Sequence, residues 1–278
     1  MMCRKCAVQM GTIGLLLTFF LTATAAKAET DTAALLERIE RLEQEVARAN
    51  DRDAIQNLFS RYQYLHNAFE DEKIIPLWAK KGTPGIRAQY SNLGVYNTWE
   101  SITQYHRGRP RPVGKLLLHY VTTPLIEVAA DGKTAKGLWV VSGIESGLTD
   151  AEVAEKAPEY MYEKAVVDGK KVWMHTVFVK YGIDFIKQDG EWKIWHFHCF
   201  EVARSPHGMG WIPFAAAAQD ESFNFDLMYF GDNGAPVFMP KPDAPATIKS
   251  NSYRTDTSQY LEARPPEPYT TFSETFEY

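Results

Sequence analysis

The stretch Trp173–Gln188, WMHTVFVKYGIDFIKQ, is followed after Asp189-Gly190 by Glu191–Val202, EWKIWHFHCFEV. Both runs are rich in β-branched and aromatic residues, which favour strands. An Asp-Gly step between two such runs is a strong hairpin signal, because both residues tolerate a positive φ. The sequence therefore predicts two long antiparallel strands joined by a tight turn.

One face of each predicted strand carries large apolar side chains interrupted by titratable groups. Residues of one parity share a face of a strand. In the first strand His175 and Tyr181 thus lie among Trp173, Val177, Val179, Ile183 and Phe185. In the second strand the same rule predicts one face for Trp192, Ile194, His196 and His198. A few polar groups in an apolar wall are typical of a small-molecule pocket.

The elements on either side of this hairpin predict an α+β domain. Apolar residues of 53–69 recur at helical spacing, which places Tyr62 and His66 one turn apart on the buried face. Further helices are expected at 74–79, 99–106 and 149–164, and further strands at 116–121, 125–130 and 137–146. Helices followed by antiparallel strands indicate an α+β fold and not alternating βαβ units.

The N-terminus has the pattern of a secretory signal peptide. Arg4 and Lys5 precede an apolar run at 13–23 and then an Ala-Lys-Ala cleavage site at 26–28. The run is too short to cross a bilayer as a helix. We therefore expect residues 1–28 to be removed and the chain to be periplasmic or secreted.

Residues 29–50 form a predicted heptad helix. Its apolar positions alternate at spacings of four and three: Leu35, Ile39, Leu42, Val46 and Ala49. Such a helix either lies on its own domain or pairs in an oligomer, so we expect a homo-oligomer, a dimer or a trimer. Residues 51–229 then form the main domain. The Pro- and aromatic-rich tail, 230–278, is expected to cover a neighbouring surface or to be disordered.

Charge and cysteine content narrow the range of partners. The formal net charge is −5 and no basic stripe is visible, which argues against nucleic acid and anionic membranes. Removal of the signal peptide takes Cys3 and Cys6 with it and leaves Cys199 alone, so no internal disulfide is expected.

Three stretches resemble the SnoaL-like branch of the nuclear transport factor 2-like superfamily, over about Asp53–Arg204. They are RYQYLH (61–66), LHYVTTPLIEVAADGKTAKGLWV (118–140) and VFVKYGIDFIKQDGEWKIWHF (177–197). The resemblance implies a cone-shaped, curved antiparallel sheet wrapped around N-terminal helices, with a deep pocket. Scytalone dehydratase, ketosteroid isomerase and polyketide cyclases belong to this superfamily and use acid–base side chains without a cofactor.

Many members carry a catalytic aspartate near the end of the first long helix. His66 and Asn67 stand there in this chain, so a mechanism based on His and Tyr fits better than one based on Asp. His66 is the candidate general base, Tyr62 the candidate donor to a developing oxyanion, and His119 a second acid–base candidate at a position resembling one that the family uses.

Six further residues are candidates for substrate binding: His175, Tyr181, Trp192, His196, His198 and Arg107. The pair His196-x-His198 with Glu201 nearly matches a cupin metal motif. However, Glu201 has the opposite parity, so fewer than three ligands converge and no metal is expected.

The sequence thus predicts a cofactor-independent lyase or isomerase that removes a proton and a small fragment, such as water, from an aromatic or polycyclic molecule. A lyase that releases formaldehyde from lignin-derived diaryl compounds fits the same aromatic pocket. Two non-catalytic alternatives remain open: an exported binding protein that uses the pocket as a ligand cup, and an oligomerisation scaffold built on the heptad helix.

Overall fold

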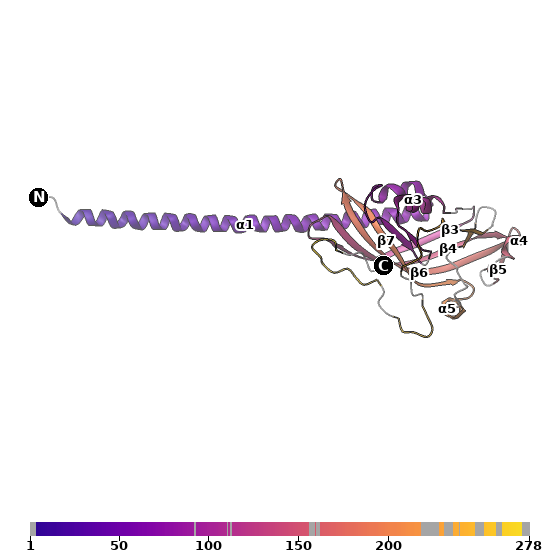
Figure 1. Ribbon diagram of the computed structural model, residues 1–278. Helices are drawn as coiled ribbons and strands as arrows, with labels where there is room; N and C mark the ends of the chain where they lie inside the picture. The colour runs from indigo at the N-terminus through magenta and orange to yellow at the C-terminus, as the bar shows by residue number, and fades with distance from the viewer. Residues whose placement is uncertain are drawn as a thin grey trace. The chain divides into compact units, whose positions relative to one another are not determined.

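A computed structural model describes residues 4–91, 93–109, 111, 113–155, 159, 162–217, 228–230, 236–238, 240–247, 253–259 and 263–273. The chain divides into two compact units, residues 1–50 and 51–278. Helix α1 (Arg4–Asn67) supplies residues to both (Figure 1). Across the described ranges, none of the helices combines the length and the apolar character that a membrane span requires.

The second unit has the predicted α+β composition. After α1, its helices are α2 (Asp71–Ile74), the 3₁₀ turn η1 (Ile75–Leu77), α3 (Trp99–Arg107), α4 (Ala151–Ala154) and α5 (Trp211–Ala217). Its strands are β1 (Arg87–Tyr90), β2 (Val95–Tyr96), β3 (Leu116–Val128), β4 (Thr134–Asp150), β5 (Tyr162–Val167), β6 (Lys170–Gln188), β7 (Glu191–Pro206), β8 (Met228–Phe230) and β9 (Pro236–Phe238).

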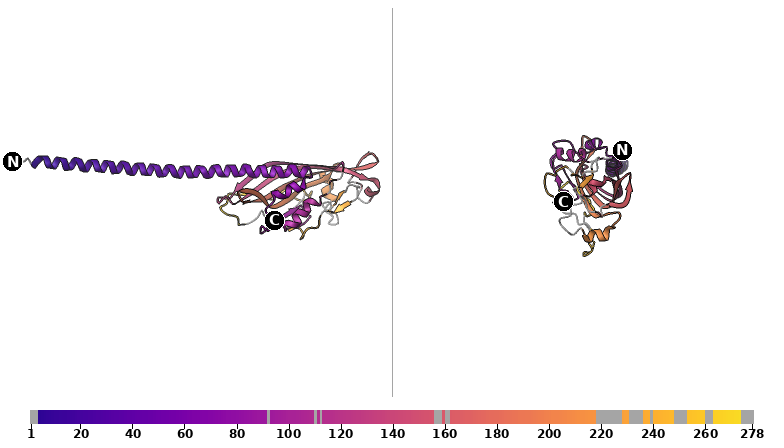
Figure 2. Two further views of the ribbon diagram at one scale, coloured as in Figure 1. Left: turned by 90° about the horizontal axis from the view of Figure 1, so that it is seen from above. Right: turned by 90° about the vertical axis from the view of Figure 1, so that its right-hand side faces the viewer.

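One sheet forms the body of this unit, in the order β2-β1-β7-β6-β4-β3, with β5 paired to the end of β6. Only β1 and β7 run parallel among the described pairs of this sheet. The sheet is strongly curved, and α3 lies to one side of it (Figures 1 and 2). This curved sheet with N-terminal helices is the fold that the sequence predicts.

The predicted β6–β7 hairpin is confirmed. Asp189 and Gly190 both have positive φ, 50° and 82°, as a tight two-residue turn requires. The β4–β6 pairing is unbroken from Thr134 against Ile186 to Asp150 against Lys170. Side chains of one parity therefore share a face along the whole length of these two strands, as predicted for β6.

Two bulges in β7 change the prediction for that strand. Ile194 pairs with Phe185 and His196 with Asp184, so Trp195 is an extra residue; Val202 is a second extra residue. A bulge reverses the parity of every later residue. Ile194 therefore shares the core face with Phe197, and the prediction that His196 and His198 lie on the face of Trp192 is wrong.

The C-terminal part of helix α1 packs on the concave face of the sheet and completes the core. Ile55, Phe59 and Tyr62 are almost fully buried, on the stripe that the sequence predicts. The Phe59 ring packs 4.4 Å from the ring of Trp139 on β4 and 6.3 Å from that of Phe197 on β7. Burial of each such aromatic side chain contributes about 2–3 kcal/mol and fixes this part of α1 over the sheet.

Helix α3 begins where the sequence predicts. The Thr98 side chain accepts a hydrogen bond from the Ser101 amide, and the Ser101 hydroxyl accepts one from the Thr98 amide. This capping box satisfies two amides that the first turn would otherwise leave without partners.

Three segments differ from the predictions. The predicted strands at 116–121 and 125–130 are one strand, β3, with an irregularity between Thr122 and Leu125. The helix predicted at 149–164 is confirmed only for α4 among the described residues; β4 continues to Asp150 and β5 starts at Tyr162, and both pair with the long strand β6. The short strands β1 and β2 lie between the helices predicted at 74–79 and 99–106, where no strand was predicted.

Part of the tail packs on its own domain. The amides of Ala130 and Asp131 donate to the carbonyls of Tyr269 and Thr270. The Phe272 ring lies 4.7 Å from that of Trp195, the residue that the first bulge turns outward. Residues 269–272 therefore cover the outer side of the sheet.

Candidate active site

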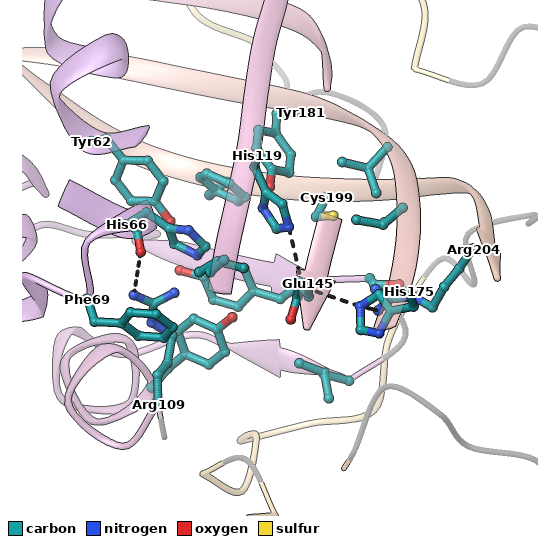
Figure 3. Close-up of a pocket in the computed structure, with 18 of the residues that line it drawn as sticks. Tyr62, His66, Phe69, Arg109, His119, Glu145, His175, Tyr181, Cys199 and Arg204 are labelled. Atoms are coloured by element: carbon teal, nitrogen blue, oxygen red, sulfur yellow. Dashed lines mark hydrogen bonds and ion pairs between the residues drawn. The ribbon is translucent and has the colours of Figure 1, made fainter. Parts of the chain in front are cut away.

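A cavity lies in the second unit, between the end of α1 and the concave face of the sheet (Figure 3). It encloses about 1050 Å³ of empty space, its open mouth included. Its walls are largely apolar, with Leu117, Trp173, Val177, Val179 and Phe197. The polar groups that line it are Tyr62, His66, Tyr90, Ser91, Tyr105, Arg109, His119, Glu145, His175, Tyr181, Cys199 and Arg204.

Glu145 is the centre of this polar set. It lies on β4, directly opposite His175 on β6, and two residues along from Gly143, which pairs with His119 on β3. One of its oxygens, Oε1, is 3.3 Å from Nε2 of His119 and 3.6 Å from Nε2 of His175 (Figure 3). The register of three strands thus places one carboxylate between two imidazoles.

Glu145 is a charged carboxylate at neutral pH although it is buried. Burial raises its pKa, but His175, His119 and Lys115 outweigh that effect and hold the pKa of Glu145 well below its usual range. Because an isolated buried carboxylate would be very costly, its charge depends on these neighbours.

Asn67 fixes the backbone of His119. Its amide nitrogen donates to the His119 carbonyl at 3.0 Å, and its Oδ1 accepts from the His119 amide at 3.1 Å. Gln63 in turn donates to the same Oδ1 at 2.9 Å. Asn67, one of the two residues predicted near the family's usual aspartate, therefore joins α1 to β3.

Tyr62 and His66 both reach the cavity from α1. The His66 ring stacks between the rings of Tyr62 and His119, at centroid distances of 5.8 and 5.7 Å. Burial and the nearby Arg109 guanidinium lower the pKa of His66 well below its usual value. Burial likewise raises the pKa of Tyr62. Both side chains are therefore neutral at neutral pH, and His66 is a weak base.

Arg109, two residues beyond the end of α3, lines the cavity. Its guanidinium is buried, donates to Asp71 Oδ1 at 2.7 Å and to the His66 carbonyl at 3.1 Å. Arg107, predicted to bind substrate, is half exposed and pairs with Glu72 on the outside. Arg107 is the last residue of α3, and Arg109 follows two positions later. Of the two, only Arg109 lines the cavity.

The far end of the cavity holds His175 and Arg204. Nη1 of Arg204 lies 3.2 Å from Nε2 of His175. The same Nε2 also lies 3.6 Å from Oε1 of Glu145, so one ring nitrogen lies between a carboxylate and a guanidinium. Burial lowers the pKa of His175, and Glu145 opposes that effect. Tyr181 lines the same cavity on β6.

The remaining predicted binding residues lie outside the cavity lining. Trp192 donates its indole N–H to Asp51 at 2.8 Å. His196 is buried against Asp184, with Nδ1 2.9 Å from Oδ2. His198 stacks on Phe200 at 3.8 Å, and burial lowers its pKa to about 3. The bulge at Trp195 explains why neither His196 nor His198 lines the cavity, since it places both side chains on the face opposite Phe197.

Three charged lining residues, Glu145, Arg204 and Arg109, were not assigned to the site from the sequence. Glu145 interrupts an alternating apolar run with Trp139 and Val141 on the same face, and a charged residue at a core position is a usable signal. Arg204 has the parity of Trp192, and because the two bulges of β7 cancel, it lies on that face, so strand alternation was a usable signal. Arg109 belongs to a run of basic residues with Arg107 and Arg111, any of which could close on a carboxylate or phenolate, and a solvated loop was the default interpretation.

No group of three or more His, Cys, Asp or Glu side chains within the described part of the chain is placed to bind a metal ion.

Comparison with known proteins identifies the family. The model of the SnoaL-like domain matches residues 47–198. The chain belongs to the SnoaL-like family. Proteins of this kind bind small molecules and often form oligomers, and their fold is that of small-molecule lyases and isomerases. None of the curated proteins matches the chain in sequence.

Solved structures are similar to this chain at low identity. A provisionally named scytalone dehydratase from Novosphingobium aromaticivorans is 14% identical over 59% of this chain and 91% of its own, with a TM-score of 0.43. A hexachlorocyclohexane dehydrochlorinase of LinA type 2 is 17% identical over 58% and 92%, with a TM-score of 0.44. The type 3 enzyme from Novosphingobium barchaimii is 18% identical over 61% and 99%, with a TM-score of 0.42.

Proposed function

We propose that this protein is a cofactor-independent lyase that eliminates water or a similar small group from an aromatic or polycyclic substrate. The observation that carries the proposal is the meeting of Tyr62, His66 and His119 at one apolar-walled cavity, with a charged carboxylate behind His119. An elimination needs a base, a hydrogen-bond donor to the leaving group and a site with little water, and this arrangement supplies all three.

His119 is the best-placed general base. With Nε2 directed at Glu145, the carboxylate holds the ring and stabilises the imidazolium that proton abstraction creates. Nε2 lies 3.3 Å from Oε1 of Glu145, whereas Nδ1 has neither a hydrogen bond nor an ion pair among the described residues, so we assign proton acceptance to Nδ1. His66, predicted as the base, is less suitable because burial and Arg109 oppose its protonation.

Tyr62 and His66 act as neutral groups in this scheme. His119 removes the proton next to an activated carbon, the new double bond forms as the carbon–oxygen bond breaks, and the departing oxygen takes the proton back from His119. The Tyr62 hydroxyl, which burial keeps protonated, donates a hydrogen bond to that oxygen as negative charge develops. The apolar walls favour a flat, hydrophobic substrate.

The test is a screen of aromatic alcohols for loss of water, followed by ultraviolet absorbance and mass spectrometry. His119→Ala should lower turnover by about 10²–10⁴-fold, as expected for loss of a general base. His207→Ala is the matched control, because His207 is exposed and outside the cavity lining. Release of formaldehyde would instead support the carbon–carbon lyase, and saturable binding without product would support the ligand cup.

We also propose that the protein is exported. The proposal is supported by Arg4 and Lys5, the apolar run at 13–23 and the Ala-Lys-Ala site. Expression of the full chain in a bacterium, followed by cell fractionation and N-terminal sequencing, tests it. A periplasmic product that begins at residue 29 is expected, and a cytoplasmic product that keeps residue 1 would contradict it.

A further inference from the structure

The helix of the first unit presents a stripe of exposed apolar side chains. Leu35, Ile39, Leu42 and Val46 have 59, 49, 48 and 58% of their surface exposed. They recur at alternating spacings of four and three, which is the 3.5-residue period of a coiled-coil seam. Large apolar side chains at every position of such a seam are costly in water and mark an interaction surface.

The residue types along this seam specify the number of strands. The β-branched residues Ile39 and Val46 occupy the a positions, and Leu35 and Leu42 occupy the d positions. β-branched side chains at a combined with Leu at d favour two parallel strands, whereas other combinations favour trimers or tetramers. The seam therefore fits a pair of helices.

The charges beside the seam specify the partner and its direction. Arg38 occupies a g position and Glu43 the following e position. In a parallel, in-register pair of identical helices the g residue of one copy faces this e residue of the other. Arg38 of each copy then faces Glu43 of the other, twice by symmetry, so the helix is complementary to itself.

We infer that residues 35–49 form a parallel two-stranded coiled coil with a second copy of this chain. The contact is isologous, so it closes as a dimer and leaves no seam exposed. It brings two SnoaL-like domains together through a segment that supplies no residue to the cavity, and the cavity of each copy is complete without it.

Disulfide trapping tests the pairing and its direction. The full chain carries Leu42→Cys, with Cys3, Cys6 and Cys199 replaced by Ser. In a parallel pair the two new thiols face each other across the seam, so mild oxidation should convert most of the protein to a covalent dimer. Gln44→Cys, at an outward f position in the same background, is the control and should give less than about a tenth of that yield. Equal yields at both sites, or no dimer from Leu42→Cys, would overturn the inference.

Charge reversal tests the partner through the same readout. Arg38→Glu or Glu43→Arg alone places like charges opposite each other and should slow formation of the Leu42→Cys dimer about three- to tenfold. The double variant restores both pairs and should recover the original rate. These side chains are exposed in the single chain, so the substitutions leave the domain core unchanged. A double variant as slow as either single one would contradict self-pairing.

Discussion

The ring of His119 lies directly against the backbone of Gly143, its cross-strand partner on β4. A Cβ built at Gly143 would lie 2.1 Å from Cδ2 of His119 and 2.8 Å from Nε2. Only glycine leaves room for the ring to lie over β4 and to reach Glu145, the next residue on the same face.

Gly143→Ala should therefore disable the site without unfolding the protein. The new methyl group must displace His119, and a shift of about 1 Å at a catalytic group lowers turnover by about 10²-fold. Turnover and the melting temperature are measured together. Gly208→Ala is the control, since its nearest contact is a half-buried Glu163 side chain at 3.6 Å. Full activity in Gly143→Ala would mean that the position of His119 is unimportant.

Glu145→Gln should weaken catalysis by removing the charge that stabilises the His119 imidazolium. A loss of about 10²-fold in kcat/KM is expected, because the amide keeps the shape of the carboxylate and loses its charge. Glu152→Gln, at an exposed carboxylate of α4, serves as the control. Unchanged kcat/KM in Glu145→Gln would exclude an acid–base role for the pair.

The same variant has a predictable effect on stability. The folded-state pKa of Glu145 is depressed, so its charge contributes stability that is present above about pH 4.3 and is lost as the pH falls through the folded value. The difference in unfolding free energy between wild type and Glu145→Gln should be constant from pH 8 to 6 and shrink in acid. Urea unfolding at several pH values measures it.

Periodicity was sufficient to predict most of the fold and half of the site. Local pattern predicts the helical spacing of Ile55, Phe59 and Tyr62 and the alternation of β6. Both predictions are correct because no extra residue interrupts either element. Parity fails where an extra residue enters a strand. The bulge at Trp195 turns His196 out of the predicted pocket face, and sequence alone gives no sign of it.

The cavity itself depends on contacts between distant elements. Glu145 contacts His119 and His175 because three strands share one register. Arg109 points inward, where its guanidinium pairs with Asp71. Such relations span 26 to 38 positions in the sequence. A single sequence shows which residues could act, and the pairing of strands decides which of them meet.

Phe272 should contribute to stability and not to catalysis. Its ring packs 4.7 Å from Trp195 on the outer side of the sheet, and Lys136 lies over it at 5.5 Å. Phe272→Ala should lower the unfolding free energy by about 1–2 kcal/mol, since the side chain is only partly buried. Turnover should stay within about twofold of wild type. Thr271→Ala, at the exposed neighbour, is the control, and equal stability of the two variants would show that the ring contact is unimportant.

Buried histidines should make the protein sensitive to acid, and His198 gives the sharpest test. Burial and the nearby Arg87 lower its folded-state pKa to about 3, whereas an imidazole in the unfolded chain titrates near 6.5. Between these two pH values the His198 imidazole is protonated in the unfolded chain and neutral in the folded chain. Each unit of pH below about 6 therefore costs the wild type about 1.4 kcal/mol through this residue.

His198→Phe removes the imidazole that binds a proton in the unfolded chain, and it keeps a flat ring against Phe200. Relative to wild type, the unfolding free energy of His198→Phe should rise by about 1.4 kcal/mol for each unit of pH between 6 and 4. Above about pH 7 the two curves should run parallel, since neither state of the wild type then binds the proton. Urea unfolding at pH 8, 7, 6, 5 and 4 measures both ranges. Parallel curves over the whole series would mean that His198 titrates alike in the folded and unfolded chain, and its burial would then have no electrostatic consequence.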